Sequence, residues 1–264
     1  MICSKLTCRS TQHGGVRSPS SLFLFAISLI PALFFCTTTA LPLSAQMRSF
    51  ECAEKSTLLK KEGEALLTKL QASYTGFEAL HGSFRQESFL AALDVSEASS
   101  GEMWFARPGQ MRWEYTEPKP QVVVIRDQTL WLYQIDKRQV MIDDIGEVLL
   151  SDLPISFMMG LGSLARDFDF KGACRSTDGV VLSLVPRLKA GDNKGVGELS
   201  GFDLLVDEGA AVPKGAKVAS LGGNVTAIVF EGITSKGVTP PPAAFVLEYP
   251  KGVDIMDRRV HPRS

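Results

Sequence analysis

The feature that most constrains the fold is a long succession of short segments in which apolar and polar residues alternate. Alternation with a period of two is typical of β-strands, because successive side chains point to opposite faces of a sheet. Turn-forming sequences such as Pro-Gly, Asp-Gly and Gly-Gly-Asn separate the segments. Strands joined by such short connections must be antiparallel neighbours. After two strands around Phe84 and Phe105, the expected strands are Gln110–Tyr115, Gln121–Arg126, Thr129–Gln134, Gln139–Asp143, Phe168–Cys174, Val180–Val185, Leu199–Val206, Lys217–Leu221, Val225–Ile233 and Phe245–Tyr249.

An amphipathic helix is expected before the strands. Between Leu59 and Tyr74 apolar residues recur at spacings of three and four, so a helix should begin near Arg48 and end near Gly76. Residues 144–164 lose both periods and are rich in leucine, phenylalanine and methionine, which fits an apolar lid. The pattern predicts an α+β fold: an incomplete, half-open antiparallel β-barrel that is covered by helices and encloses a hydrophobic cavity.

The N-terminal residues have the layout of a secretory signal peptide. Basic residues precede an apolar run from Leu22 to Phe35, and small residues follow the run. The run is shorter than the roughly 20 residues that a membrane-spanning helix needs, so a transmembrane anchor is the less favoured alternative. We interpret residues 1–45 as a signal peptide, cleaved after Ala40 or Ala45, and residues 46–264 as a single exported domain.

Two cysteines, Cys52 and Cys174, lie beyond the signal peptide. An oxidising compartment allows two such thiols to pair. Two independent thiols are the alternative, because a sequence does not give the distance between two residues.

The residues that enzymes and metal sites use are scarce. His81 and His261 are the only histidines beyond the signal peptide, and the sequence has no zinc-ligand spacing, P-loop, dinucleotide fingerprint or nucleophile elbow. Asp143 and Asp144 resemble an acid/base pair, but adjacent strand residues point to opposite faces. The formal net charge of −1, without a long basic run, gives no reason to expect nucleic-acid binding. We therefore expect no catalysis, no cofactor and no metal.

Aromatic and sulfur-containing side chains gather on neighbouring predicted strands, which carry all three tryptophans. For each of these residues an ordinary place in the core is the alternative. Methionine adapts its shape easily, which suits a surface that meets flexible ligands. A half-closed barrel lined in this way can hold a dry cavity large enough for acyl chains. The candidate lining residues are Trp104, Met111, Trp113, Phe157 and Met158.

Several segments, taken in order, resemble the LolA family, the periplasmic carriers of outer-membrane lipoproteins. The stretch Gly-Glu-Met-Trp-Phe-Ala-Arg-Pro-Gly-Gln-Met-Arg-Trp is similar to the family's signature hairpin. Phe-Arg-Gln and Thr-Leu-Trp-Leu-Tyr are similar to its Phe-x-Gln and Thr-Leu-Trp-x-Tyr strands. The resemblance extends from about Glu51 to Asp257. The matching segments are Phe84–Gln86, Gly101–Trp113, Thr129–Tyr133, Gly223–Thr226, Phe245–Leu247 and Pro250–Asp254.

The resemblance implies a monomeric periplasmic carrier without covalent chemistry. Its cavity would hold the acyl chains of a lipoprotein, an inner-membrane ABC transporter of the Lol type would load it, and an outer-membrane lipoprotein acceptor would receive the cargo. Arg107 matches the family's arginine at the Arg-Pro turn, which is understood to hold the lid closed by donating to lid carbonyls. A guanidinium has five fixed donors and suits this role. A solvated turn arginine, and a lipoprotein-binding sensor of similar fold, are the alternatives.

Overall fold

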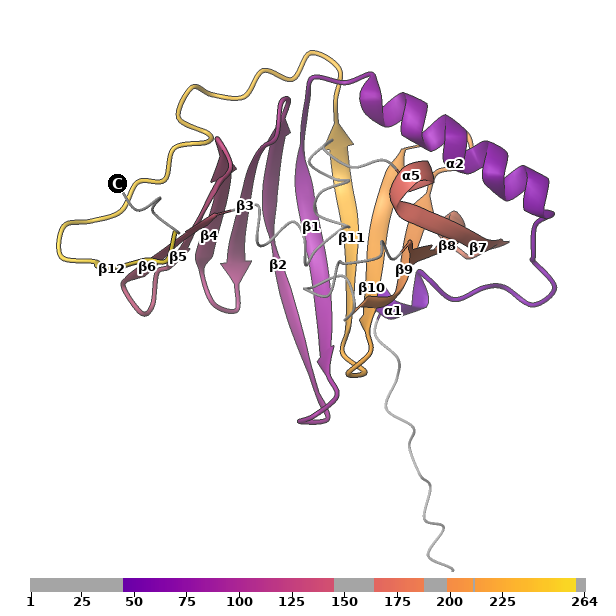
Figure 1. Cartoon of the computed structure of the whole chain (residues 1–264), viewed down its shortest axis with the longest axis horizontal. Coiled ribbons are helices and arrows are strands. Elements are labelled where there is room, and N and C mark those ends of the chain that lie inside the picture. The colour runs from indigo at the N-terminus through magenta and orange to yellow at the C-terminus, as the bar shows by residue number, and fades with distance from the viewer. Residues whose placement is uncertain (1–44, 145–163, 188–198, 211, 260–264) are drawn as a thin grey trace, which may run out of the picture. The chain divides into compact units, whose positions relative to one another are not determined.

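Twelve strands form one open sheet (Figure 1). The computed structural model describes residues 45–144, 164–187, 199–210 and 212–259. The order across the sheet is β12-β6-β5-β4-β3-β2-β1-β11-β10-β9-β8-β7, and no pairing among the described residues joins the two edge strands. The strands are β1 (Ala79–Leu90), β2 (Val95–Ala106), β3 (Gln110–Glu117), β4 (Gln121–Arg126), β5 (Thr129–Gln134), β6 (Gln139–Asp144), β7 (Phe168–Arg175), β8 (Val180–Pro186), β9 (Leu199–Val206), β10 (Pro213–Ser220), β11 (Val225–Thr234) and β12 (Asp254–Asp257).

The sheet is built from two runs of antiparallel strands. Each strand from β1 to β6 pairs with the next, and so does each strand from β7 to β11. Antiparallel pairing of β1 with β11 joins the two runs, with Phe84 opposite Phe230. The antiparallel neighbours that the short turns predicted are therefore confirmed. The exception is the parallel pair of β12 and β6.

The helix before the sheet is shorter than expected. α2 spans Lys60–Thr75 and ends at Gly76 as predicted, but it does not begin near Arg48. Residues between α1 (Ala45–Arg48) and α2 instead run beside the edge strand β7, where the amide of Leu58 donates to the carbonyl of Ala173 at 2.9 Å. The backbone groups of this segment are satisfied by the edge of the sheet, so they are not available for a helix.

The C-terminal strand was predicted at the wrong place. Residues Phe245–Tyr249 are not a strand; β12 lies further on, at Asp254–Asp257. The apolar side chains that suggested a strand pack on the sheet instead, since Phe245 is buried against Val122 and Val124. Most of the predicted lid, residues 144–164, lies outside the described residues.

The two faces of the sheet have different covers. One face packs against Leu66, Leu67 and Leu70 of α2, and we call it the α2 face. Its residues form the largest buried cluster, which includes Leu80, Phe84, Met103, Phe105, Met111, Trp113, Ile125, Phe168, Leu182, Leu184, Phe202, Leu204 and Phe230. Gly63 allows this approach, because a Cβ there would overlap the ring of Phe170.

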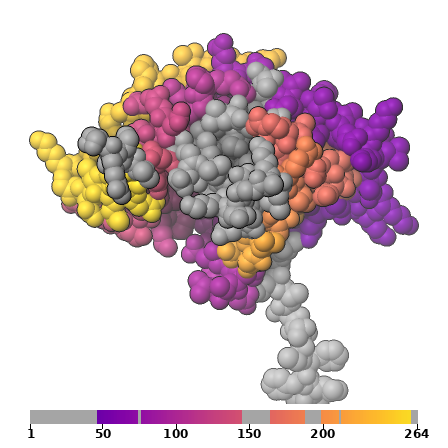
Figure 2. All heavy atoms as spheres, in the orientation of Figure 1, coloured from indigo at the N-terminus to yellow at the C-terminus, as the bar shows by residue number. Residues whose placement is uncertain are grey.

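The opposite face is covered by both ends of the described chain. Phe50, just after α1, packs on Val181, Leu205 and Ala227. The segment after β11 covers the β1–β6 half, and in Figure 2 its yellow atoms lie beside the strands of that half while the indigo atoms of α2 lie toward β7 and β8. Each face of the sheet therefore has its own cover, α2 on one face and the two ends of the described chain on the other.

Candidate functional site

An aromatic row crosses the middle of the α2 face. Trp113 of β3 packs on Phe84 of β1, with ring centroids 4.5 Å apart, and meets Phe230 of β11 edge-on at 6.3 Å. Phe84 also contacts the ring of Tyr115 at 5.0 Å. Phe84 reaches over β2 to these rings because the residue between them is Gly101, which has no side chain.

Apolar side chains adjoin the aromatic row toward the start of β1. Met111 lies opposite Phe105 on one side and opposite Ile125 on the other. Met111 and Trp113 are each 6% exposed, so both belong to the buried surface of this face. The structure thus brings together Met111 and Trp113, two of the predicted lining residues, and adds Phe84, Phe105 and Phe230 to them.

Polar side chains form a hydrogen-bonded chain at the other end of the face. The Tyr115 hydroxyl donates to Oε1 of Gln86 at 3.1 Å, and Nε2 of Gln86 donates to the hydroxyl of Ser88 at 3.2 Å. The hydroxyls of Ser88 and Thr226 are 3.2 Å apart. Burial raises the pKa of Tyr115 to about 12, with its polar neighbours Gln86 and Trp113 opposing the rise, so the phenol is neutral at physiological pH.

Trp104 lies on the opposite face and not with the other predicted lining residues. Side chains alternate along a strand, and Trp104 stands between Met103 and Phe105, which both point to the α2 face. It pairs with Arg112, stacks on the ring of His81 at 3.8 Å, and packs against the cover formed by the C-terminal segment. Trp104 cannot share one cavity surface with Met111 and Trp113.

Arg107 lies in the turn between β2 and β3, and hydrogen bonds join it to the segment between α2 and β1. Its Nε donates to the carbonyl oxygen of Phe77 at 3.1 Å, and its backbone amide donates to the carbonyl of Glu78 at 2.9 Å. Phe77 comes directly after Gly76, which ends α2, so the guanidinium satisfies a carbonyl beside the helix terminus. The expected contact with the lid lies outside the described residues.

Phe157 and Met158 lie outside the described residues. The enclosed cavity, and the part of Phe157 and Met158 in it, stay predictions.

Cys52 and Cys174 are joined by a disulfide, with their Cα atoms 5.6 Å apart. The bond ties the segment that follows α1 to the edge strand β7. It lies on the opposite face, where Cys174 packs in the same cluster as Phe50.

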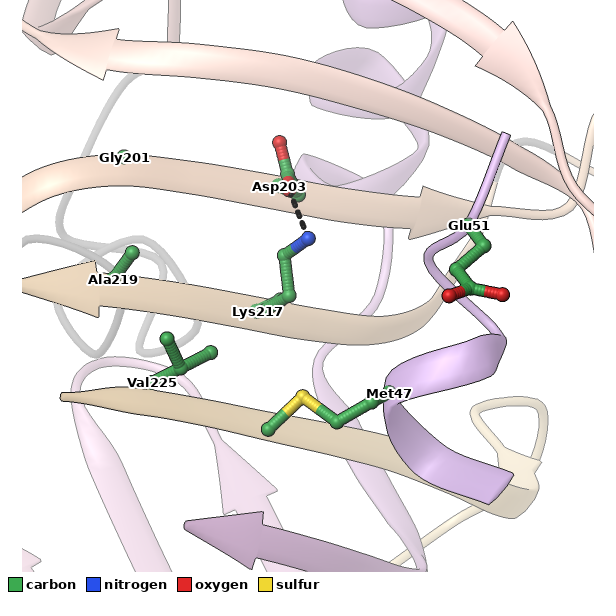
Figure 3. A pocket seen from close by; sticks show the side chains of 7 residues that line it. All are labelled: Met47, Glu51, Gly201, Asp203, Lys217, Ala219 and Val225. Carbon is green, nitrogen blue, oxygen red and sulfur yellow. Dashed lines mark ion pairs between the residues drawn. The ribbon is translucent and has the colours of Figure 1, made fainter. Parts of the chain in front are cut away.

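A shallow pocket on the opposite face is lined by both charged and apolar residues (Figure 3). Lys217 and Asp203 form an ion pair across neighbouring strands, with Nζ 2.7 Å from Oδ2. Met47 of α1 and Glu51 close one side. A paired charge on the floor makes this pocket a poor site for acyl chains.

The charged groups of the described residues show no arrangement for chemistry. Glu87 on the opposite face is 8% exposed and burial raises its pKa, while a hydrogen bond with Ser96 lowers it. In the described ranges no group of three or more His, Cys, Asp or Glu side chains is placed to hold a metal ion. Among the described helices none has the length and apolar character needed to cross a bilayer.

The fold and this site define a protein organised around one large apolar sheet face. Comparison with known proteins gives its family: residues 75–248, more than half of the chain, match the outer membrane lipoprotein carrier protein family, LolA. The chain belongs to the LolA family. The predicted resemblance is confirmed over most of the segments that suggested it.

Two relatives with similar sequences agree with this assignment. An outer-membrane lipoprotein carrier protein of Chromobacterium violaceum is 31% identical over 192 residues, which cover 72% of this chain and 86% of the relative. A protein of the same name from Cupriavidus taiwanensis is 31% identical over 198 residues, covering 73% and 88%. Among solved structures, an uncharacterized conserved protein from Thermus thermophilus is similar with a TM-score of 0.47 and 13% identity, covering 74% of this chain and 98% of that one.

Proposed function

We propose that this protein is a periplasmic carrier that binds the acyl chains of lipoproteins released from the inner membrane and delivers them to the outer membrane. The apolar α2 face, in a chain of the LolA family, is the observation that carries the proposal. Burying apolar surface is favourable and needs no directional contacts, so one face can hold the chains of many different lipoproteins.

The energetics require partners at both membranes. Each buried methylene contributes about 0.8 kcal/mol, so lifting one acyl chain of roughly 16 carbons out of a bilayer costs more than about 10 kcal/mol. The sequence has no nucleotide-binding motif, so an inner-membrane ABC transporter of the Lol type would supply the energy. An outer-membrane acceptor would then take the cargo, and the carrier itself would need no catalytic group.

Export fits the positions of the first described residues. We interpret residues 1–45 as the signal peptide, with cleavage after Ala40 or Ala45. Either cleavage keeps Met47 and Phe50, which pack on the opposite face of the sheet. Intact-mass measurement of the protein from a periplasmic extract should give an N-terminus at Leu41 or Gln46. An N-terminus beyond Phe50 would contradict this interpretation.

A two-step transfer assay tests the carrier proposal. The exported protein is mixed with inner-membrane vesicles, the transporter and ATP. We expect a soluble one-to-one complex with an acylated protein, and no complex with a cargo variant whose acylated cysteine is replaced. Outer-membrane vesicles are then added, and the cargo should move to them.

Each failure has a different meaning. Failure to form any soluble complex would overturn the carrier proposal. A stable complex that never delivers its cargo would favour the alternative, a lipoprotein-binding sensor.

A further inference from the structure

We propose that the indole N–H of Trp113 donates a hydrogen bond to an acyl carbonyl of the bound lipid. The inference rests on the proposed carrier function and adds an orientation to it. The hydrocarbon chains would lie at the Met111 end of the α2 face, and the ester-linked end of the lipid would lie toward Tyr115.

The first support is an unpaired donor. Trp113 is 6% exposed, and its Nε1 has no hydrogen-bond partner among the described residues. The Tyr115 hydroxyl is near, but the indole N–H does not reach hydrogen-bond geometry with it. Leaving a buried hydrogen-bond donor without an acceptor costs about 1–3 kcal/mol of stability. Such a donor in an apolar surface therefore indicates a functional role, and binding of a ligand acceptor would supply one.

The second support is a gradient along the strands of the α2 face. On β1, Leu80 and Phe84 are buried, whereas Gln86 and Ser88 are half-buried. The neighbouring strands repeat this order, since β3 passes from Met111 through Trp113 to the half-buried Tyr115. Trp113 therefore stands where the apolar part of the face gives way to the polar part.

An amphiphile matches such a gradient in one direction. Its hydrocarbon chains belong against Met111, Phe105 and Ile125, which the buried cluster of the described chain surrounds with apolar side chains. The polar chain from Tyr115 to Thr226 lies beyond the aromatic row and can receive the glyceryl part of the lipid. The carbonyl between these two parts then falls beside Trp113.

The charges on this part of the face favour an uncharged acceptor. Glu97 lies opposite Ser88 and faces the same side, whereas Arg85 of β1 points to the opposite face and pairs there with Glu231. A phosphate would be repelled by the carboxylate, and the arginines of β1 and β3, Arg85 and Arg112, lie on the opposite face, whereas an ester carbonyl needs only one donor. The ligand class that the site fits is an acyl ester rather than a phospholipid headgroup.

The experiment changes the carbonyl and the donor separately. The first probe is a short peptide whose N-terminal cysteine carries an S-glyceryl group with two octanoyl esters and a free amine. The second probe has two octyl ethers in place of the esters and so lacks both ester carbonyls. Affinities of the wild-type protein and of Trp113→Phe are measured by titration calorimetry, since the short chains keep both probes soluble.

We expect the wild-type protein to bind the ester about fivefold more tightly than the ether, the factor that one hydrogen bond contributes. Trp113→Phe should lose this preference and bind the ester and the ether equally, because any change in packing against the smaller ring affects both probes alike. Trp131→Phe is the matched control, because Trp131 lies on the opposite face and should change neither affinity.

The outcomes separate the two proposals. Equal affinity of the wild-type protein for ester and ether would overturn the Trp113 hydrogen bond while leaving the carrier proposal intact. This outcome is measured on the wild-type protein alone, so it does not depend on whether the Trp113→Phe variant folds. If neither probe bound, the carrier function itself would fail and the Trp113 assignment with it.

Discussion

At the scale of single residues, the chemistry of this protein depends on which polar groups have partners within an apolar surface. Trp113 and Arg107 both lie on the β2–β3 hairpin, yet the hydrogen-bond donors of their side chains differ in whether they have an acceptor. Within the described ranges the indole N–H of Trp113 has no partner, whereas Nε of Arg107 donates to the carbonyl of Phe77. A donor with a partner holds a segment in place, and one without a partner can bind a ligand.

Arg107→Leu should keep uptake of lipoprotein and impair its release. A guanidinium can satisfy several carbonyls at once, and leucine can satisfy none, so the closed empty state would lose stability relative to the loaded state. We expect transfer to outer-membrane vesicles to slow by about tenfold, as one charged hydrogen bond of roughly 1.5–3 kcal/mol allows. The measurement is the rate of cargo transfer from the purified complex.

Arg112→Leu is the control for this variant. Arg112 lies further along β3, faces the opposite side of the sheet and is paired with Glu114 at 2.8 Å. Its loss should leave the transfer rate unchanged. A normal transfer rate in Arg107→Leu would contradict the expected role of Arg107 in holding the lid closed.

At the scale of elements, the aromatic row exists because β2 carries a glycine between two aromatic strands. Gly101 lies at a register shift in the β2–β3 pairing, opposite Phe84 on one side and Tyr115 on the other. A Cβ at this position would overlap the carbonyl oxygen of Glu114 on the adjacent strand. Backbone atoms cannot yield as the end of a side chain can, so the strand pairing itself depends on this glycine.

Gly101→Ala should therefore lower the free energy of unfolding by about 1–3 kcal/mol or more, the cost of inserting a methyl group where there is no room. Chemical denaturation of the purified variant measures the change. Gly201→Ala is the matched control on β9, because no heavy atom of the described chain lies within 4 Å of a Cβ at that position. Equal stability losses in the two variants would contradict the steric argument.

At the scale of the whole molecule, the described chain is held together by contacts between its distant parts. The pairing of β1 with β11, two strands far apart in sequence, connects the two runs of strands. The residues after α1 and those after β11 cover different halves of the same face. The disulfide between Cys52 and Cys174 adds a covalent link across 122 residues.

Reduction of this disulfide should destabilise the whole sheet. Opening a loop of this length restores chain entropy to the unfolded state, which corresponds to roughly 4–5 kcal/mol in the simple chain-entropy treatment. We expect a fall in Tm of about 10 °C when reductant is added. Differential scanning calorimetry measures the shift, and the double variant Cys52→Ser, Cys174→Ser should show no response to reductant. An unchanged Tm of the wild-type protein would show that the link contributes nothing.

Local pattern was enough to predict the antiparallel sheet. Strand bounds such as Gln121–Arg126 and Thr129–Gln134 agree with the structure residue for residue. They could be predicted because alternation and turn residues act between close neighbours in sequence. The family could be predicted for a related reason, since the order of short motifs such as the Gly101–Trp113 hairpin is itself a property of the sequence.

The tertiary structure alone decided which face each strand residue occupies. Trp104 and Trp113 have similar sequence surroundings, but the pairing of β2 with β3 places them on opposite faces. Distant contacts likewise decided that α2 begins at Lys60 and that Phe245 packs on the sheet without joining it. Alternation tells which residues share a face, but the face that becomes buried under α2 depends on where remote segments pack, and no local pattern contains that information.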